Sequence, residues 1–298
     1  MVGRRSSGAK NRKSPVGRLF DGANVLVMIL LGAVMVYPFL YTANVSISAG
    51  EKVLAGGAFL LPENPTLIAY KTVLSSSSLW VAYKNTILVT LLGTIAKVFF
   101  TGLTAYVLSK RSLPLNGLFT FLVVFTMLFQ GGLIPKFLVV KGIGLYNSRL
   151  ALVLPGLIGA FSVVIMRNFF QGIPSEIEDC AQIEGASPLV IFFRIIIPLS
   201  MPVVATISLW YAVGIWNDFF QCLVFIRDRS KMVVQLLLRE IVMLSNIDEY
   251  TEMHTQGIVI EETVKAAAVM IVTLPILAVY PFLQKYFVKG AIMGSLKG

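Results

Sequence analysis

Few side chains in this 298-residue chain could take part in catalysis or bind a metal. His254 is the only histidine, which excludes histidine-based metal sites and Ser-His-Asp triads. Cys180 and Cys222 lie in different segments, so a disulfide scaffold is excluded as well. No Gly-x-x-x-x-Gly-Lys-Ser/Thr loop for nucleotide phosphates occurs. We therefore predict no catalytic residue and no metal or cofactor bound by this chain.

Lys97 is the charged residue that stands out inside a long apolar segment. It precedes Lys110 by 13 residues, which is about 20 Å along a helix. An ionisable group at such depth is expected to face a bundle interior or a wet cavity. Three interpretations stay open: a residue that lines a solute pathway, a member of a structural ion pair, or a lysine that snorkels to the segment end.

A second polar group, Trp216-Asn217-Asp218, lies near the far end of another apolar segment. Asp218 follows Ser200 by 18 residues, or about 27 Å along a helix. An aromatic ring beside hydrogen-bonding groups suits a sugar, which has apolar faces and hydroxyls along its edges. The alternative is an interfacial tryptophan with a solvated aspartate.

Residues 171–199 predict two short capped helices. Ser175 followed by Glu178 has the spacing of a capping box, so a helix should start there with Glu178 serving mainly as a cap. Gly185 suits the left-handed residue that ends it. Ser187 then fits an N-cap with Pro188 at the first helical position, and Pro198 closes the second helix.

This helix-turn-helix could be an amphipathic connector that lies on the membrane, or a docking surface for a soluble partner. Its acids, Glu176, Glu178, Asp179 and Glu184, favour the second interpretation, because an anionic inner leaflet repels acidic faces. Acids near a helix start can also be simple dipole partners.

Composition indicates that these groups are positioned by helices in a membrane. Hydrophobic residues make up 56% of the chain and charged residues 13%, against roughly 25% charged in ordinary soluble domains. Lys and Arg exceed Asp and Glu by ten. We attribute this excess to topology and lipid headgroup contact, and expect no nucleic-acid partner.

Six apolar segments are long enough to cross a bilayer core, which needs about 20 helical residues. They are residues 22–43, 84–108, 115–135, 150–169, 201–226 and 264–286. The runs are continuous, which predicts an all-α integral membrane protein instead of a barrel. Gly131, Gly132 and Pro135 are expected to break the third segment near its outer end. Irregular backbone at that depth is tolerated where it lines a cavity or is buried in protein. The stretch 232–244, in the polar segment between the fifth and sixth spans, is apolar enough for a rim helix.

Six spans place both termini on one side. The basic tail, residues 1–21, predicts that this side is the cytoplasm. Residues 22–288 form a single transmembrane domain with its core at about 80–285, and residues 289–298 form a cytoplasmic tail.

The segment 171–199 resembles the EAA loop of bacterial ABC-importer permeases. That pattern is Glu-Ala-Ala, three residues, Gly, nine residues, Ile, any residue, Leu-Pro. The matching positions here are Asp179, Cys180, Ala181, Gly185, Ile195, Ile197 and Pro198. Asp for Glu, Cys for Ala and Ile for Leu are mild departures that bear on exact contacts.

The likeness extends over about residues 20–298. Trp216-Asn217-Asp218 and the tail from Lys285 to Gly298 resemble the carbohydrate-uptake branch, which includes the smaller permease subunit of the maltose transporter. The stretches 211–214 and 227–230 resemble the subgroup associated with complex oligosaccharides.

The resemblance implies a type I importer permease in the bacterial cytoplasmic membrane. Such a subunit assembles with a second permease, two ATPase subunits that bind ATP and Mg²⁺, and an extracytoplasmic solute-binding protein. It implies that the coupling contact comprises Asp179, Cys180, Ala181, Glu184, Gly185, Ile195 and Pro198. It also implies that Lys289, Gly290, Lys297 and Gly298 reach toward the ATPases; simple anchoring of the last span is the alternative.

The expected function is import of a carbohydrate, an oligosaccharide by the subgroup likeness, powered by ATP hydrolysed in another subunit. An ion-coupled secondary transporter for a small polar solute is the alternative, but it should show interrupted helix pairs and membrane carboxylates in matching halves. A membrane enzyme would need clustered His, Cys or carboxylate side chains in a span.

Overall fold

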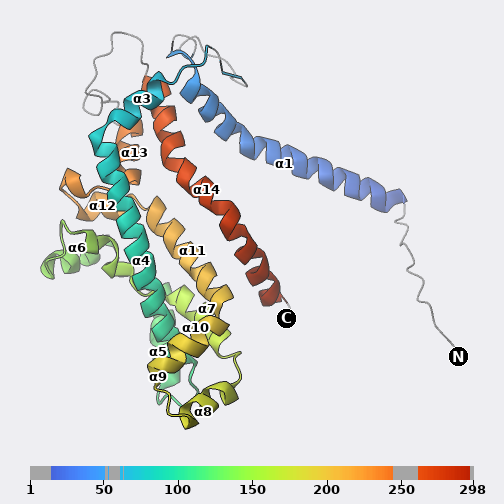
Figure 1. Ribbon diagram of the computed structural model, residues 1–298, viewed down its shortest axis with the longest axis vertical. Helices are drawn as coiled ribbons and strands as arrows, with labels where there is room; N and C mark the ends of the chain where they lie inside the picture. The colour runs from blue at the N-terminus through green and yellow to red at the C-terminus, as the bar shows by residue number, and fades with distance from the viewer. Residues whose placement is uncertain (1–14, 51–52, 54–60, 63, 244–260, 296–298) are drawn as a thin grey trace.

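The computed structural model describes residues 15–50, 53, 61–62, 64–243 and 261–295, and the side chains of residues 15, 16, 18 and 279–295 lie outside that description. Within these ranges the chain is helical, and no strand occurs (Figure 1). The helices are α1 (Pro15–Ile47), α3 (Ile68–Ser75), α4 (Ser77–Ser109), α5 (Asn116–Leu128), α6 (Leu133–Gly142), η1 (Arg149–Leu152), η2 (Leu154–Gly156), α7 (Ala160–Phe170), α8 (Ser175–Ile183), α9 (Pro188–Ile191), η3 (Phe192–Ile196), α10 (Ile197–Leu199), α11 (Met201–Asn217), α12 (Phe220–Phe225), η4 (Arg229–Lys231), α13 (Val234–Met243) and α14 (Glu261–Ser295).

Where the sequence predicts six spans, the described residues contain two unbroken apolar helices and three bent pairs, and the predicted span 201–226 is broken at residues 218–219. In the described part of the chain, residues 19–47 of α1 and all of α4 are long and apolar enough to cross a membrane. Counting each bent pair as one span raises that number from two to five. The pairs are α5 with α6, η1–η2 with α7, and α9–α10 with α11.

The expected break in the third segment is confirmed. The axes of α5 and α6 differ by 115°, and residues 129–132 between them are not helical. Gly132 has a φ of +82°, a left-handed value that glycine adopts without steric cost.

A second sharp bend, of 88°, lies at Ser200. A π-helical turn, Phe192–Ile196, precedes Pro198, which has no N–H to continue the helical ladder. The helix ends at Leu199, one residue after the proline that was expected to close it.

The core is built where α4, α7 and α11 pack together. Ala105 of α4, Met166 of α7 and Ile207 of α11 are fully buried there. Ile191 and Ile196, from the segment after α8, belong to the same cluster. The lower half of the molecule in Figure 1 is therefore one packed unit that extends to the α8–α9 hairpin.

At the opposite end, α13 confirms the rim helix expected within 232–244. Its buried residues Val234 and Leu237 pack with Leu79 of α4 and Ala267 of α14. The hydroxyl of Thr86 accepts a hydrogen bond from the Val234 backbone N–H at 2.8 Å.

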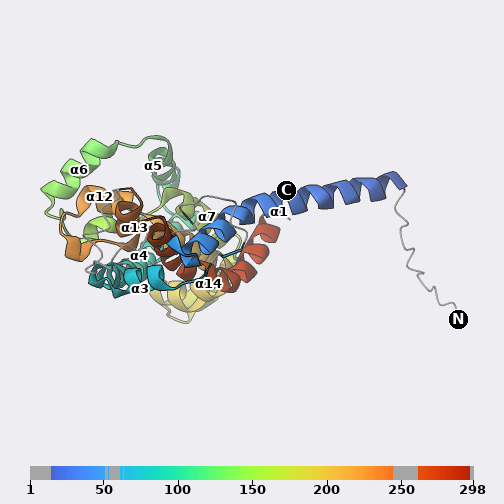
Figure 2. The same cartoon turned by 90° about the horizontal axis from the view of Figure 1, so that it is seen from above.

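Helix α1 lies apart from this body. It contacts α14 and α3 near its C-terminal end and then projects outward (Figure 2). From Leu19 to Leu40 its apolar side chains are exposed to the surroundings. Such a surface needs lipid or another apolar protein surface to cover it.

The first and last helices, α1 and α14, extend into the segments predicted as terminal tails. Helix α1 begins at Pro15, inside the expected tail 1–21, and α14 continues to Ser295, beyond the expected boundary at 288. Lys289 and Gly290 are therefore helical residues of α14. Lys297, Gly298 and His254 lie outside the described residues.

Candidate functional site

The hairpin of α8 and α9 is closed by local hydrogen bonds, as its sequence predicts. Gly185 has a φ of +85°. Its N–H donates to the Gln182 carbonyl at 2.9 Å, and the Ala186 N–H donates to the Ala181 carbonyl at 2.9 Å. This is the Schellman pattern for a helix end. Ser187 then caps α9, because its hydroxyl accepts from the Val190 N–H at 3.4 Å.

The predicted capping box is wrong. Ser175 is the first residue of α8, not its N-cap, and the N-cap position is taken by Pro174 without a side-chain bond. Glu178 instead accepts a hydrogen bond from the Tyr106 hydroxyl at 2.9 Å and forms an ion pair with Lys110. A charged and a phenolic donor stabilise a carboxylate more than one backbone N–H does.

Glu178 therefore anchors the hairpin to the end of α4. Its side chain is 12% exposed, whereas that of Lys110 is 32% exposed. Arg167 of α7 donates to the Leu108 carbonyl at 2.8 Å beside this contact. The exposed hairpin is thus joined to the end of α4 by polar contacts between side chains, and α4 is bonded in turn to α7.

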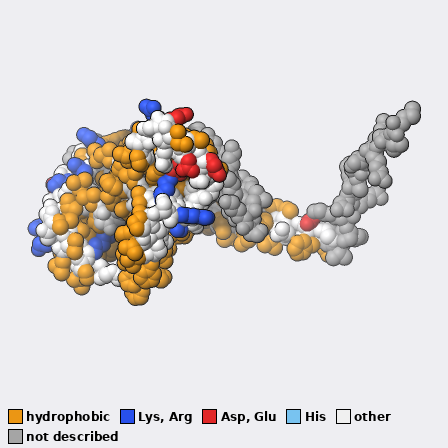
Figure 3. Space-filling view, turned by 90° about the horizontal axis from the view of Figure 1, so that it is seen from below, with side chains coloured by type: hydrophobic (Ala, Val, Ile, Leu, Met, Phe, Trp, Pro, Cys, Tyr) orange, Lys and Arg blue, Asp and Glu red, His pale blue; other side chains and the backbone are white. Residues whose placement is uncertain are grey.

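The outer surface of the hairpin carries most of the residues expected to couple. Asp179, Cys180, Glu184 and Gly185 are exposed, whereas Ala181 is buried against the core. Pro198 is exposed and Ile195 is partly buried, both on the second arm. In Figure 3, carboxylates gather beside Lys and Arg side chains on this end of a largely apolar surface.

Ile183 is a member of this surface that the sequence analysis missed. Its side chain is 87% exposed at the last position of α8, next to Glu184. Its exposure adds an apolar side chain to the acidic surface of the hairpin. The sequence signal was that Ile183 is apolar but does not lie on the same helical face as Ala181, the residue of α8 that packs against the core.

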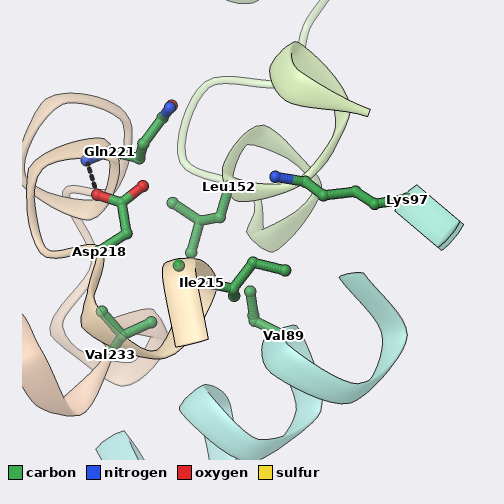
Figure 4. Close-up of a pocket in the computed structure, with 8 residues that line it drawn as sticks. Val89, Lys97, Leu152, Ile215, Asp218, Gln221 and Val233 are labelled. Atoms are coloured by element: carbon green, nitrogen blue, oxygen red, sulfur yellow. Dashed lines mark hydrogen bonds between the residues drawn. The ribbon is translucent and has the colours of Figure 1, made fainter. Parts of the chain in front are cut away.

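Lys97 and Asp218, predicted separately, line one cavity of about 180 Å³ (Figure 4). Lys97 reaches in from α4, and Asp218 lies on the opposite wall in the two-residue break between α11 and α12. The remaining wall consists of Val89, Leu152, Gly214, Ile215, Gln221 and Val233. This volume is below the roughly 300–1,000 Å³ typical of small-ligand sites.

Trp216, Asn217 and Asp218 do not form one site. Asp218 lines the cavity, whereas Trp216 and Asn217 do not. The Trp216 ring packs near Tyr83, with ring centroids 6.3 Å apart. Asn217 donates to the Val213 carbonyl at 2.9 Å. Consecutive residues of a helix point about 100° apart, so three in a row cannot share one face.

Sequence reasoning missed two residues of this region, Gln221 and Lys136. The Asp218 carboxylate accepts a hydrogen bond from the Gln221 N–H at 3.0 Å. This bond lies in the first turn of α12. Lys136 of α6 donates to the Gln221 side-chain oxygen at 3.2 Å. The available signal for Lys136 was its place directly after the predicted break at 131–135.

The stretch 227–230, which suggested the oligosaccharide subgroup, forms a turn that leads into the short helix η4. The Ser230 hydroxyl and backbone N–H both donate to Asp228, and they hold the pKa of that carboxyl below its usual value. Asn85 of α4 donates to the Ser230 and Met232 carbonyls and fastens the turn. Among the described residues, no cluster of His, Cys, Asp and Glu could hold a metal ion.

Known proteins resemble this chain along nearly its whole length. Protein LplC of Bacillus subtilis (strain 168) is 44% identical over 283 residues, which are 95% of this chain and 96% of that protein. The polygalacturonan/rhamnogalacturonan transport system permease protein YtcP of the same organism is 42% identical, over 94% of this chain and 99% of its own.

A solved structure has the same fold. It is the crystal structure of a bacterial ABC transporter involved in the import of the acidic polysaccharide alginate. The TM-score is 0.84 at 32% identity, over 92% of this chain and 99% of that one. These similarities confirm the relation to ABC-importer permeases that residues 171–199 had indicated.

The family profile described as binding-protein-dependent transport system inner membrane component matches residues 79–292. The match runs from α4 through α14 and includes both the hairpin and the cavity. Since it covers well over half of the chain, this protein belongs to the family of binding-protein-dependent transport system inner membrane components.

Proposed function

We propose that this chain is one of two permease subunits of an ATP-driven importer that translocates an oligosaccharide delivered by a binding protein. The family and the alginate-importer fold support this, as does the permease name of YtcP. The single observation that carries the mechanism is the α8–α9 hairpin, which exposes Asp179, Cys180 and Ile183 on a helix that Glu178 fastens to the end of α4.

The hairpin can act as a lever because it is stiff and tied to the core. A contact that moved α8 would pull on Glu178 and thereby on Lys110 and the whole of α4. Lys97, which lines the cavity, lies 13 residues back along that same helix. Rigid elements transmit a displacement that a flexible loop would absorb.

In this proposal α1, α14, α4 and the three bent pairs form six spans with both termini in the cytoplasm. The partners are a second, related permease, two ATPase subunits that bind ATP and Mg²⁺, and the binding protein. The coupling surface would dock on an ATPase, and Lys289 and Gly290 at the end of α14 would extend toward the ATPases. The chain itself would hydrolyse nothing.

The test uses Gly185. Gly185→Pro fixes φ near about −65° and forbids the left-handed turn, whereas Gly185→Asn tolerates it. We expect the proline variant to lose at least about 10-fold of the ATP hydrolysis that loaded binding protein stimulates in the reconstituted complex. The asparagine variant should stay close to wild type.

Assembly of both variants is checked by co-purification of the ATPase subunits. If loaded binding protein stimulated ATP hydrolysis in the Gly185→Pro complex as strongly as in wild type, the hairpin would be a passive connector. Uptake that follows an ion gradient and continues without ATP would contradict the proposed function as a whole.

A further inference from the structure

We propose that the second arm of the hairpin, residues 188–199, lies along the membrane surface on the hairpin's side and binds an anionic phospholipid headgroup through Arg194. The arm consists of α9, the π-helical turn η3 and α10, and it joins the hairpin to α11. Its partner is a lipid phosphate. This inference goes beyond the proposed function, because a lipid contact can be measured without transport.

The bend at Ser200 sets the direction of the arm. The axes of the arm and of α11 differ by 88°. Since α11 begins the predicted fifth span, the arm runs close to the plane of the membrane. Figure 1 shows α9 and α10 crossing the lower part of α4.

The level of the arm follows from its ring contacts with α4. The ring centroids of Phe192 and Tyr106 are 5.3 Å apart, and those of Phe193 and Phe99 are 6.0 Å apart. Tyr106 and Phe99 precede the last residue of α4 by three and ten residues, or about 5 and 15 Å along the helix. Helix α4 has 33 residues and is about 50 Å long, against about 30 Å for a hydrocarbon core. Its ends therefore project into the headgroup regions, and the arm lies beside one of them.

The arm is apolar on its outer side as well as on its inner side. Its inner side chains, Ile191, Phe192 and Ile196, are buried in the core cluster. A helix that is apolar all round is either buried or lies in a membrane. The outer side chains are large and exposed, and they need acyl chains or another apolar surface to cover them: Leu189, Val190, Phe193 and Leu199.

Arg194 adds a charge complementary to an anionic headgroup. It is the only charged residue between positions 188 and 217. Its side chain is exposed and forms no hydrogen bond or ion pair with another described residue. An arginine among lipid-facing side chains lays its stem along the acyl chains and extends its guanidinium to the headgroups. The planar guanidinium can donate two parallel hydrogen bonds to one phosphate.

The two arms of the hairpin therefore suit different partners. Helix α8 exposes Glu176, Asp179 and Glu184, which an anionic lipid surface repels. The second arm carries no acid and one arginine. With α8 turned to a protein and the second arm held on lipid, a displacement of the hairpin would reach α11 with less slack.

The test uses the complete importer in nanodiscs of phosphatidylcholine, alone or mixed with phosphatidylglycerol. A photoreactive benzoylphenylalanine replaces Leu189, whose side chain is 59% exposed, and its adducts are identified by mass spectrometry. We expect adducts with phospholipid, in which phosphatidylglycerol exceeds its share of the mixture. Arg194→Gln should lower the ratio of phosphatidylglycerol to phosphatidylcholine adducts by about 5-fold, the factor for one basic side chain at an anionic surface.

Two variants serve as controls for the charge. Arg194→Lys should keep most of the preference for phosphatidylglycerol, because an ammonium group still attracts a phosphate. Arg227→Gln removes another exposed arginine, in the turn at 227–230, and should leave the adduct ratio unchanged.

ATP hydrolysis stimulated by loaded binding protein gives a second readout. In wild type it should be faster with phosphatidylglycerol than without it. Arg194→Gln should lose that difference and keep the rate measured in pure phosphatidylcholine.

Adducts of position 189 with the second permease or an ATPase subunit would overturn the inference and make the arm a subunit contact. An adduct ratio that Arg194→Gln leaves unchanged would overturn it as well. Stimulation that is missing in every lipid would contradict the proposed function instead, and the adducts would still decide the lipid contact. The two failures are therefore distinguishable.

Discussion

At the scale of single residues, Glu178 joins the exposed α8 helix to the end of α4 through Tyr106 and Lys110. Its position in the chain suggested a helix cap, since Ser175 lies three residues before it. The partners that it finds lie 68 and 72 residues away, and they leave its carboxylate 12% exposed. Removing its charge should therefore weaken the joint between hairpin and core.

We expect Glu178→Gln to destabilise the purified complex by about 1–2 kcal/mol, because the ion pair is only partly buried and Lys110 loses its partner. Lys110→Gln should cost a similar amount. Thermal unfolding in detergent should show that the double variant loses less than the sum of the two. Additive losses would mean that the two side chains do not stabilise each other.

At the scale of elements, one tyrosine holds three helices together. The Tyr211 hydroxyl of α11 bonds to Thr101 of α4 at 2.8 Å and accepts the N–H of Gly159, which starts α7, at 3.2 Å. A Cβ at Gly159 would meet that hydroxyl at 2.6 Å but the ring carbons only at 3.4 Å. The glycine is therefore required by the hydroxyl, not by the ring.

This geometry predicts a compensating pair. Gly159→Ala should destabilise the complex by about 1–3 kcal/mol through overpacking. The same substitution in a Tyr211→Phe background should cost much less, because the clashing oxygen is gone. Melting temperatures of the four proteins in one detergent provide the measurement, and an undiminished cost in the Phe background would contradict the account.

At the scale of the whole molecule, the proposed orientation places the hairpin in the cytoplasm and the turn at 227–230 outside. The two cysteines offer a direct probe, because Cys180 is exposed on α8 whereas Cys222 is buried. A membrane-impermeant maleimide should label Cys180 in inside-out vesicles and spare it in intact cells. Ser230→Cys, in the exposed turn, should show the opposite pattern when combined with Cys180→Ser.

Assembly with the ATPase subunits should then reduce the labelling rate of Cys180 by about 10-fold or more, since a docked surface excludes the reagent. Cys180→Ser is the blank for this experiment. Unchanged labelling on assembly would place the contact elsewhere on the molecule, and labelling in intact cells would reverse the orientation.

The sequence by itself determined the features that depend on neighbouring residues. The apolar runs indicated membrane helices, Gly185 and Ser187 gave the hairpin its turn, and Gly132 marked the break before α6. Each of these follows from backbone conformations and hydrogen bonds within a few residues. Such local preferences act in the same way wherever the segment lies in the fold.

Only the tertiary structure decided which distant side chains meet. It gave Glu178 its partners at the end of α4, separated Trp216 from Asp218, and brought Lys97 and Asp218 to one cavity. A side chain's direction changes by about 100° with each helical residue, and the bends at 129–132 and Ser200 redirect whole helices. The cavity therefore depends on how the broken helices pack together, which residue types and spacing alone do not specify.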